Sequence, residues 1–259
     1  GEPMRRKLKL KPKVKRAGII FLAVIVVLSG FLIYRVWNHN ATLAQGLEYI
    51  QEQENKKVKE LSSSLKDKKN AEMESAIESG QVDVFALFDD AVIFGDSRVM
   101  GFSVYHFFPE SHVLASSGAT IKDISNWVNQ AQSMNPSLIF FSYGVNDMGL
   151  DLDSEGGYDT LYQSQIEQVV KVCPDATIVV NSIISATPAA IEKSPRWDKV
   201  DEYNKKIKAM CEKNDWIYVD NSEICQNGNA DIYQADGVHF LQPFYTTWAE
   251  NMIMTVRKQ

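Results

Sequence analysis

The feature that most constrains this chain is an 18-residue run without a charged residue, from Ala17 to Tyr34. Its sequence, AGIIFLAVIVVLSGFLIY, makes a helix that is apolar on every face, whereas a helix on the surface of a globular domain has one polar face. About 20 such residues cross a bilayer as a helix. We therefore expect a transmembrane helix over residues 17–37.

A basic cluster precedes this run: residues 5–16 carry eight Lys or Arg and no acidic residue. Positive segments stay on the cytoplasmic side, so residues 1–16 are expected to be cytoplasmic and everything after the helix extracytoplasmic. This predicts a single-pass protein of the cell membrane. The alternative is a cleaved signal peptide, but the apolar run is longer than usual and only Ala44 offers a cleavage point. Residues 1–3 precede Met4 and are expected to be a cloning remnant.

Residues 38–80 are polar and rich in Lys, Glu, Gln and Ser, and are expected to form a helical stalk. Apolar residues recur there at spacings of about three and four, which is typical of an amphipathic helix or a short coiled coil. They are Leu43, Leu47, Ile50, Val58, Leu61 and Leu65. Glu54 interrupts the stripe, so a coiled coil and a single solvated helix both remain open. Ser79-Gly80 is expected to separate the stalk from a domain over 81–259.

From residue 81 onward, short apolar runs alternate with amphipathic helical patterns. Alternation of this kind predicts an α/β fold with a parallel sheet and helices on both faces. Strands are expected at 91–94, 112–115, 137–143, 176–184 and 216–220. Helices are expected at 121–133, 158–172, 197–213 and 243–257. Loops 148–157 and 185–197 are expected to be irregular and to flank the carboxyl ends of the strands, where functional residues collect.

Charge and cysteine content exclude several classes of function. Residues 81–259 carry 12 basic and 24 acidic residues, which argues against nucleic acid as a partner. No Cys or His cluster has metal-ligand spacing, so neither a metal nor a cofactor is expected. The three cysteines, Cys173, Cys211 and Cys225, allow at most one disulfide, and buried thiols are the favoured interpretation.

Two motifs far apart in the sequence predict nucleophilic catalysis. Gly95-Asp96-Ser97-Arg98 follows the first expected strand, and a serine on such a turn is exposed at the sheet edge, where a hydrolase holds its nucleophile. Among the four histidines, only His239 follows an acid, Asp236, at a spacing that lets a carboxylate orient the imidazole.

Two further positions follow expected strands. Gly118 comes after the second strand, and Asn146 lies in Gly-Val-Asn-Asp after the third. The backbone N–H of Gly118, the side-chain amide of Asn146 and the backbone N–H of Ser97 are candidate donors to an oxyanion. Asp147 and Arg98 lie beside these groups and are tentative substrate contacts.

The ordered set of GDS, a lone Gly, GVND and DGVH resembles the SGNH (GDSL-type) superfamily of esterases and acyltransferases, and spans Gly95 to His239. The resemblance implies a three-layer, flavodoxin-like domain. It also implies that Ser97 is the nucleophile, His239 the general base and Asp236 its orienting acid. Arg98 stands where the family name has Leu, which bears on the subgroup rather than on the chemistry. The G-x-S-x-G turn of the α/β-hydrolases is absent from the sequence.

This resemblance implies an extracytoplasmic serine esterase that removes small acyl groups, above all acetyl, from cell-envelope carbohydrate. The alternative is an O-acyltransferase that uses the same residues to acylate a wall polymer or exopolysaccharide, beside a multi-pass membrane acyltransferase. A non-enzymatic scaffold would lack one of the motifs, and none is missing. Four aromatic residues after Ser97 could line a channel for a long acyl chain, but a place in the core is favoured. They are Phe102, Tyr105, Phe107 and Phe108.

Overall fold

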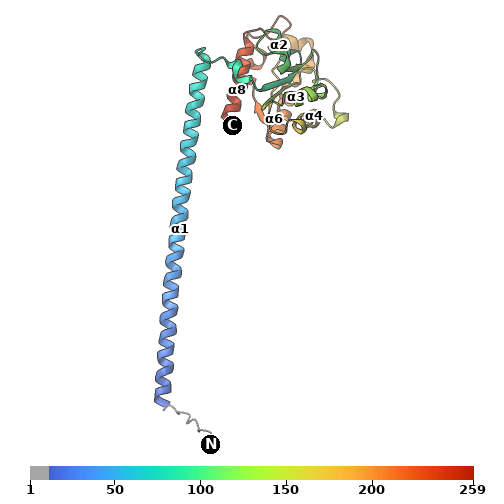
Figure 1. The fold of residues 1–259 in the computed structure, drawn as a ribbon. Coiled ribbons are helices and arrows are strands. Elements are labelled where there is room, and N and C mark those ends of the chain that lie inside the picture. Colours follow the sequence, from blue (N-terminus) through green and yellow to red (C-terminus); the bar gives the residue numbers. More distant parts are fainter. Residues whose placement is uncertain (1–11) are drawn as a thin grey trace. The chain divides into compact units, whose positions relative to one another are not determined.

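The computed structural model describes residues 12–259, so the expected cloning remnant and most of the basic cluster lie outside the described residues. The chain divides into two compact units, one ending at Leu65 and the other running from Lys66 to Gln259. Helix α1 (Pro12–Glu78) is a single element that belongs to both (Figure 1). Proline at a first helical position sacrifices no hydrogen bond, and no second proline occurs until Pro109.

Helix α1 contains both the apolar run and the polar stretch after it. Side chains of the apolar run are exposed along its length, from Ile19 to Tyr34. By length and composition, α1 is the one helix among the described residues that is long and apolar enough to cross a membrane. The apolar stripe between Leu43 and Leu65 is exposed as well.

The second unit contains a five-stranded sheet with the order β2-β1-β3-β4-β5, in which every neighbouring pair is parallel. The strands are β1 (Ala91–Gly95), β2 (Val113–Ala115), β3 (Leu138–Ser142), β4 (Thr177–Asn181) and β5 (Ile217–Val219). This is the flavodoxin-like order of doubly wound folds, in which ligands bind at the carboxyl ends of the strands around β1 and β3. The predicted parallel α/β fold is therefore confirmed.

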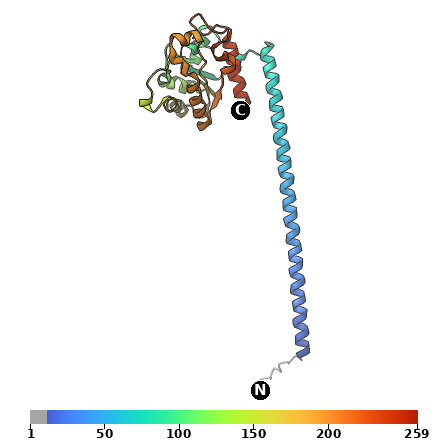
Figure 2. The same ribbon diagram turned by 180° about the vertical axis from the view of Figure 1, so that it is seen from behind.

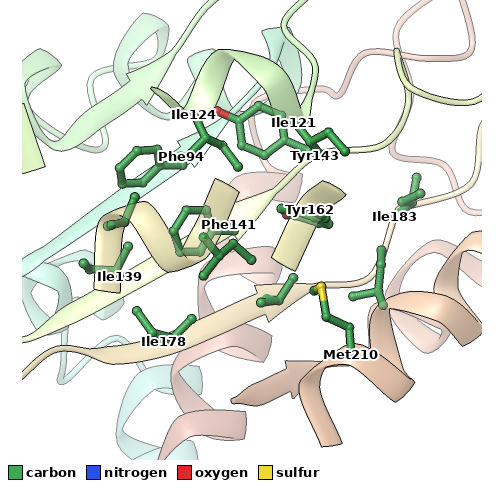
Figure 3. Close-up of a cluster of buried hydrophobic side chains, with 14 of the residues drawn as sticks. Phe94, Ile121, Ile124, Ile139, Phe141, Tyr143, Tyr162, Ile178, Ile183 and Met210 are labelled. Carbon is green, nitrogen blue, oxygen red and sulfur yellow. The ribbon is translucent and has the colours of Figure 1, made fainter. Parts of the chain in front are cut away.

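Successive strand residues point to opposite faces of the sheet, and both sets of side chains are apolar here. Helices therefore cover both faces. Phe94 and Phe141 point to the face covered by helices α3, α4 and α6, where they pack in one apolar cluster (Figure 3). Ile93 and Phe140 point to the face covered by α2 and α8. The two groups of helices are visible in Figure 1 and, from behind, in Figure 2. These helices are α2 (Ser97–Val104), α3 (Val128–Met134), α4 (Tyr158–Val172), α6 (Val200–Asn214) and α8 (Phe244–Lys258).

Several short helices were not expected, and some others form part of a helix that was expected. The helix expected over 121–133 consists of a 3-10 segment and then α3, and the one expected over 197–213 begins within a 3-10 segment. The loop expected over 185–197 contains α5. The short helices are η1 (Val84–Phe88), η2 (Glu110–His112), η3 (Ile121–Trp127), η4 (Asp153–Glu155), α5 (Pro188–Lys193), η5 (Pro195–Lys199), α7 (Ser222–Cys225) and η6 (Gln226–Gly228).

The last turns of α1 pack within the second unit. Ile77 is 7% exposed and belongs to the apolar cluster on the α2 and α8 face. The Asn70 side-chain amide donates to the carbonyl of Arg257 at 3.2 Å, and the Lys66 ammonium donates to the carbonyl of Gln259. The unit that contains the sheet therefore starts within α1, before the boundary expected at residue 81.

Candidate active site

Ser97 is the first residue of α2, two residues after β1 ends at Gly95. The Asp96 carboxylate caps this helix by accepting from the Arg98 N–H at 2.9 Å. A Cβ on Gly95 would lie 2.2 Å from the Val99 side chain, so the tight return of the chain from strand to helix requires glycine here. Ser97 is partly exposed at this turn.

His239 lies on a loop that closes a short antiparallel bridge between Tyr233 and Phe240. The Gln234 N–H donates to the His239 carbonyl at 2.8 Å across this loop. At its tip, Gly237 has a φ of +71°, a conformation that favours glycine. We call residues 233–240 the His239 loop.

Asp236 and His239 are joined within this loop. The Asp236 Oδ2 atom lies 2.6 Å from His239 Nδ1, and its Oδ1 atom accepts from the backbone N–H groups of Val238 and His239. Burial opposes ionisation of Asp236, but these hydrogen bonds outweigh it and lower the pKa of Asp236 to about 2. An ionised Asp236 fixes the tautomer of His239 with its Nδ1 protonated.

The other ring nitrogen of His239 faces Ser97, with 2.9 Å between Nε2 and the Ser97 Oγ atom. The structure thus brings the three residues predicted from separate motifs into one hydrogen-bonded series, Asp236–His239–Ser97. With Nδ1 protonated, Nε2 is free to accept the hydroxyl proton of the serine. This geometry is that of a nucleophile, a base and an orienting acid.

Gly118 and Asn146 follow the two strands that flank β1. Gly95, at the end of β1, pairs with Ala115 of β2 and with Ser142 of β3, so the loops after all three strands meet at one edge. The Asn146 amide donates to the Ala119 carbonyl at 2.9 Å, which ties the two flanking loops together. Gly118 is exposed, with a φ of +74° and open space where a Cβ would stand.

The two tentative substrate contacts are buried instead. Asp147 is 0% exposed, and its Oδ1 atom accepts from the Ile121 N–H at 3.0 Å. Arg98 is 5% exposed, and its guanidinium donates to the carbonyls of Val238 and Ile184. Since both side chains are enclosed by the protein, the prediction that they contact substrate is corrected.

Burial also perturbs the Asp147 carboxyl. Removal from water, with the charges of Asp96 and Asp123 nearby, raises the pKa of Asp147 to about 7 despite the hydrogen bond from Ile121. Its Oδ2 atom is buried and has no hydrogen-bond partner among the described residues. Asp147 therefore joins the loop after β3 to η3 rather than facing solvent.

The cysteines and two of the four aromatic residues after Ser97 are buried. Cys173, Cys211 and Cys225 are free and buried, and burial raises the pKa of Cys211 to about 12. Phe102 and Phe108 are buried and stacked at 4.7 Å between ring centroids. The interpretations of buried thiols and, for Phe102 and Phe108, of aromatic core agree with the structure, whereas Tyr105 and Phe107 are partly buried and pack against that core.

Sequence reasoning missed the segment that supports the His239 loop. The Thr187 N–H donates to the Gly237 carbonyl at 2.9 Å, and the Tyr233 hydroxyl donates to the Ser185 carbonyl at 2.6 Å. This segment after β4 was expected to be irregular. Thr187-Pro188 gave a usable signal, because threonine before proline is a helix-start pattern and α5 begins there.

Comparisons with known proteins identify the family of this chain. A family model described as the GDSL-like Lipase/Acylhydrolase family matches residues 94–245. A search of curated proteins found no match.

Solved structures that resemble the chain include three bacterial proteins. A GDSL-like lipase from Bacteroides thetaiotaomicron VPI-5482 is 18% identical, with 64% of this chain and 86% of that chain covered and a TM-score of 0.49. A lipase/acylhydrolase from Enterococcus faecalis is 16% identical, with 64% and 94% covered and a TM-score of 0.49. A catalytic mutant of an acetylxylan esterase from Geobacillus stearothermophilus is 17% identical, with 64% and 93% covered and a TM-score of 0.48.

The family model covers more than half of the chain and includes Ser97, Asp236 and His239. The chain therefore belongs to the GDSL-like lipase/acylhydrolase family, a family of esterases and acylhydrolases.

Proposed function

We propose that this chain is a membrane-anchored serine esterase that removes small O-acyl groups, chiefly acetyl, from cell-envelope carbohydrate. The observation that carries the proposal is the 2.9 Å contact between Ser97 Oγ and His239 Nε2, with Asp236 on the opposite ring nitrogen. An unassisted serine hydroxyl is a weak nucleophile, and this contact supplies the base that it needs.

In the proposed reaction, Ser97 Oγ attacks the acyl carbonyl carbon while His239 Nε2 takes the hydroxyl proton. The carbonyl oxygen becomes an oxyanion, which accepts hydrogen bonds from the N–H groups of Ser97 and Gly118 and from the Asn146 amide. The bond to the sugar oxygen then breaks, and His239 returns the proton to that oxygen. Water, deprotonated by His239, attacks the acyl-enzyme, releasing the carboxylic acid and restoring Ser97.

A short acyl group fits the interior of the domain better than a long one. Phe102 is 0% exposed, and Phe108, which is 7% exposed, borders with Phe107 a hollow beside Asp89, before the start of β1 and so at the opposite end of that strand from Ser97. The rings of Phe102 and Phe108 pack with Trp248 and Tyr245 of α8 as part of the core. A long acyl chain would therefore have to displace core side chains, whereas an acetyl group requires no such space.

The apolar run supports attachment to a membrane. It forms an uninterrupted helical stretch with exposed apolar side chains, about 27 Å long at 1.5 Å per residue. Such a length matches the hydrocarbon core of a bilayer. The basic residues before it favour a cytoplasmic N-terminus and an extracytoplasmic domain. We propose 17–37 as the anchor, 38–80 as the stalk and 81–259, with the last turns of α1, as the catalytic part.

The anchor also favours a second candidate function, O-acyl transfer to a wall polymer or exopolysaccharide. A tethered enzyme works beside the membrane, where a multi-pass acyltransferase partner can supply an acyl group. The chemistry up to the acyl-enzyme is the same, and a sugar hydroxyl replaces water in the second half. The two functions differ in the acceptor that reaches Ser97.

The test uses the full chain in detergent micelles, with 4-nitrophenyl acetate, butyrate and octanoate as substrates. Ser97→Ala is expected to lower kcat by roughly 10³-fold or more, because Ser97 supplies the hydroxyl that faces His239 within residues 12–259. Ser103→Ala is the matched control, since Ser103 lies on the same helix and donates only to the Met100 carbonyl. The control is expected to retain wild-type kcat.

Neutral sugar oligomers and their acetylated forms then separate esterase from transferase. Ser97-dependent acetate release from acetylated oligomers, without acetylation of free ones, supports the esterase. Transfer of acetyl to free oligomers, detected by mass spectrometry, supports the alternative. Equal turnover by the wild type and Ser97→Ala would reject both.

A further inference from the structure

Arg98 connects the start of α2 to two other parts of the site. It directly follows Ser97, and its side chain is only 5% exposed. The Nε atom donates to the Val238 carbonyl at 2.9 Å, and Nη1 donates to the Ile184 carbonyl at 2.5 Å. Val238 directly precedes His239, so one guanidinium holds the residue next to the base while its own backbone adjoins the nucleophile.

Two neighbours of this guanidinium offset part of the cost of its burial. The Phe240 ring lies 4.9 Å from its central carbon, a distance at which a ring face attracts a cation. Burial lowers the pKa of Arg98, and the charge of Asp96, which is 2% exposed, opposes this lowering. The Nη2 atom is buried and has no hydrogen-bond partner among the described residues. Arg98 thus contacts the His239 loop through both a carbonyl and an aromatic ring.

Other contacts of the His239 loop fix it to the segment after β4, through Thr187 and Ser185, and to Tyr105 at the far end of α2. At the first turn of α2, the loop is held by the contact between His239 and Ser97 and by Arg98. Arg98 differs from the rest because its two hydrogen bonds join this turn to the loop and to the segment after β4 at once. A planar guanidinium donates in fixed directions, which suits it to set a distance between elements.

We infer that Arg98 is a positioning residue for acyl transfer, which holds His239 at hydrogen-bonding distance from Ser97 through the Val238 carbonyl. The inference rests on the proposed roles of Ser97 and His239. It assigns a function to the residue that stands where the family name has leucine. A leucine fills similar space but donates no hydrogen bond to the loop.

The experiment compares Arg98→Lys and Arg98→Leu with the wild type in the full chain in detergent. Both variants are expected to lower kcat on 4-nitrophenyl acetate, by roughly 10²-fold for leucine and less for lysine, with KM changed less than about twofold. Lysine retains the charge and can donate to one carbonyl, so it keeps the test usable if the leucine variant fails to fold. Tyr245→Phe is the matched control, because the Tyr245 hydroxyl donates to the Arg98 backbone carbonyl at 2.7 Å and leaves the guanidinium untouched.

Two readouts separate positioning from general stability. In a His239→Ala background, Arg98→Lys is expected to have no further effect on kcat, because a residue that acts through His239 has nothing left to position. The downfield proton resonance of the His239 Nδ1–H···Asp236 hydrogen bond is expected to shift or broaden in Arg98→Lys and to stay in place in Tyr245→Phe.

Wild-type kcat in a folded Arg98→Lys would overturn the inference, as would an equal loss in Tyr245→Phe or an additive loss in the His239→Ala background. Failure of the proposed function has a different signature: Ser97→Ala would then retain turnover. The proton resonance is independent of turnover and still reports whether Arg98 holds the His239 loop.

Discussion

At the scale of single residues, the site depends on which carboxylates are ionised. Asp236 is half exposed and stays charged because three hydrogen bonds converge on it. Asp147 is enclosed, and its pKa is raised to about 7. The pKa values of the two acids are therefore shifted in opposite directions, although both were candidate site residues on sequence alone.

Asp236→Asn is expected to lower kcat by about 10²-fold. An asparagine amide can turn its NH2 group, rather than its oxygen, toward His239 Nδ1. The tautomer with a free Nε2 is then no longer favoured. The loss should be smaller than the roughly 10⁴-fold of an enclosed triad, because water can reach a half-exposed site and accept in its place. Acetate release measures this, with Asp231→Asn, an exposed acid nearby, as the control. An unchanged kcat would remove Asp236 from the mechanism.

Asp147→Asn is expected to flatten the pH dependence of stability. The folded pKa of Asp147, about 7, lies above the ordinary value of 3.8, so its contribution to stability is complete below 3.8 and is lost as pH rises to 7. The wild type should therefore lose up to about 1.4 kcal/mol per pH unit relative to the variant across this range. Urea unfolding at pH 5, 6 and 8 measures the difference, and a constant difference would contradict the assignment.

At the scale of elements, the sequence predicted the strands and helices that have a regular apolar pattern. It missed those whose formation depends on tertiary contacts. The strands follow from apolar runs covered on both faces, and α4 spans the same residues as its amphipathic pattern, 158–172. Helix α2 was not expected, because Gly101 and a buried arginine break any helical stripe. The structure explains both: the Tyr245 ring occupies the space beside Gly101, and the Arg98 guanidinium has carbonyl partners from two distant segments.

The same distinction holds for the site. Ser97, Gly118 and Asn146 could be placed at one edge of the sheet because each follows a parallel strand. The docking of the His239 loop on Thr187 could not be predicted, because it rests on backbone hydrogen bonds between segments without a sequence pattern. The burial of Arg98 and Asp147 was missed for this reason.

Gly237→Ala is expected to destabilise the His239 loop by roughly 1–3 kcal/mol and to lower kcat. A Cβ there would lie 2.1 Å from the Thr187 hydroxyl oxygen, in a backbone with a φ of +71°. Gly80→Ala is the matched control, because Gly80 has a φ of +73° with open space around it. Urea unfolding and acetate release are measured for Gly237→Ala and Gly80→Ala. Equal losses of stability and of kcat in the two variants would attribute the losses to backbone strain alone.

At the scale of the molecule, the unit with the sheet begins at Lys66 and includes the end of α1. A chain that starts at residue 81 is therefore expected to be less stable than one that starts at Lys66, by about 2–4 kcal/mol. Burial of Ile77 contributes roughly 2 kcal/mol of this, and the hydrogen bond from Asn70 about 1 kcal/mol. Urea unfolding of the two chains, and of Ile77→Ala in the chain that starts at Lys66, measures this difference in stability. Equal stabilities would show that the end of α1 is dispensable.

The order of the site's parts along the chain matters during synthesis. Ser97, Gly118 and Asn146 are translated well before the His239 loop, and the elements in between include α4, β4, α6 and β5. A nascent chain that extends through Asn146 therefore contains the proposed nucleophile and oxyanion donors but no base. Hydrolysis is therefore expected to begin only once residues 233–240 have been synthesised and have folded against α2. The order of the motifs along the chain would by itself keep an unfinished chain inactive.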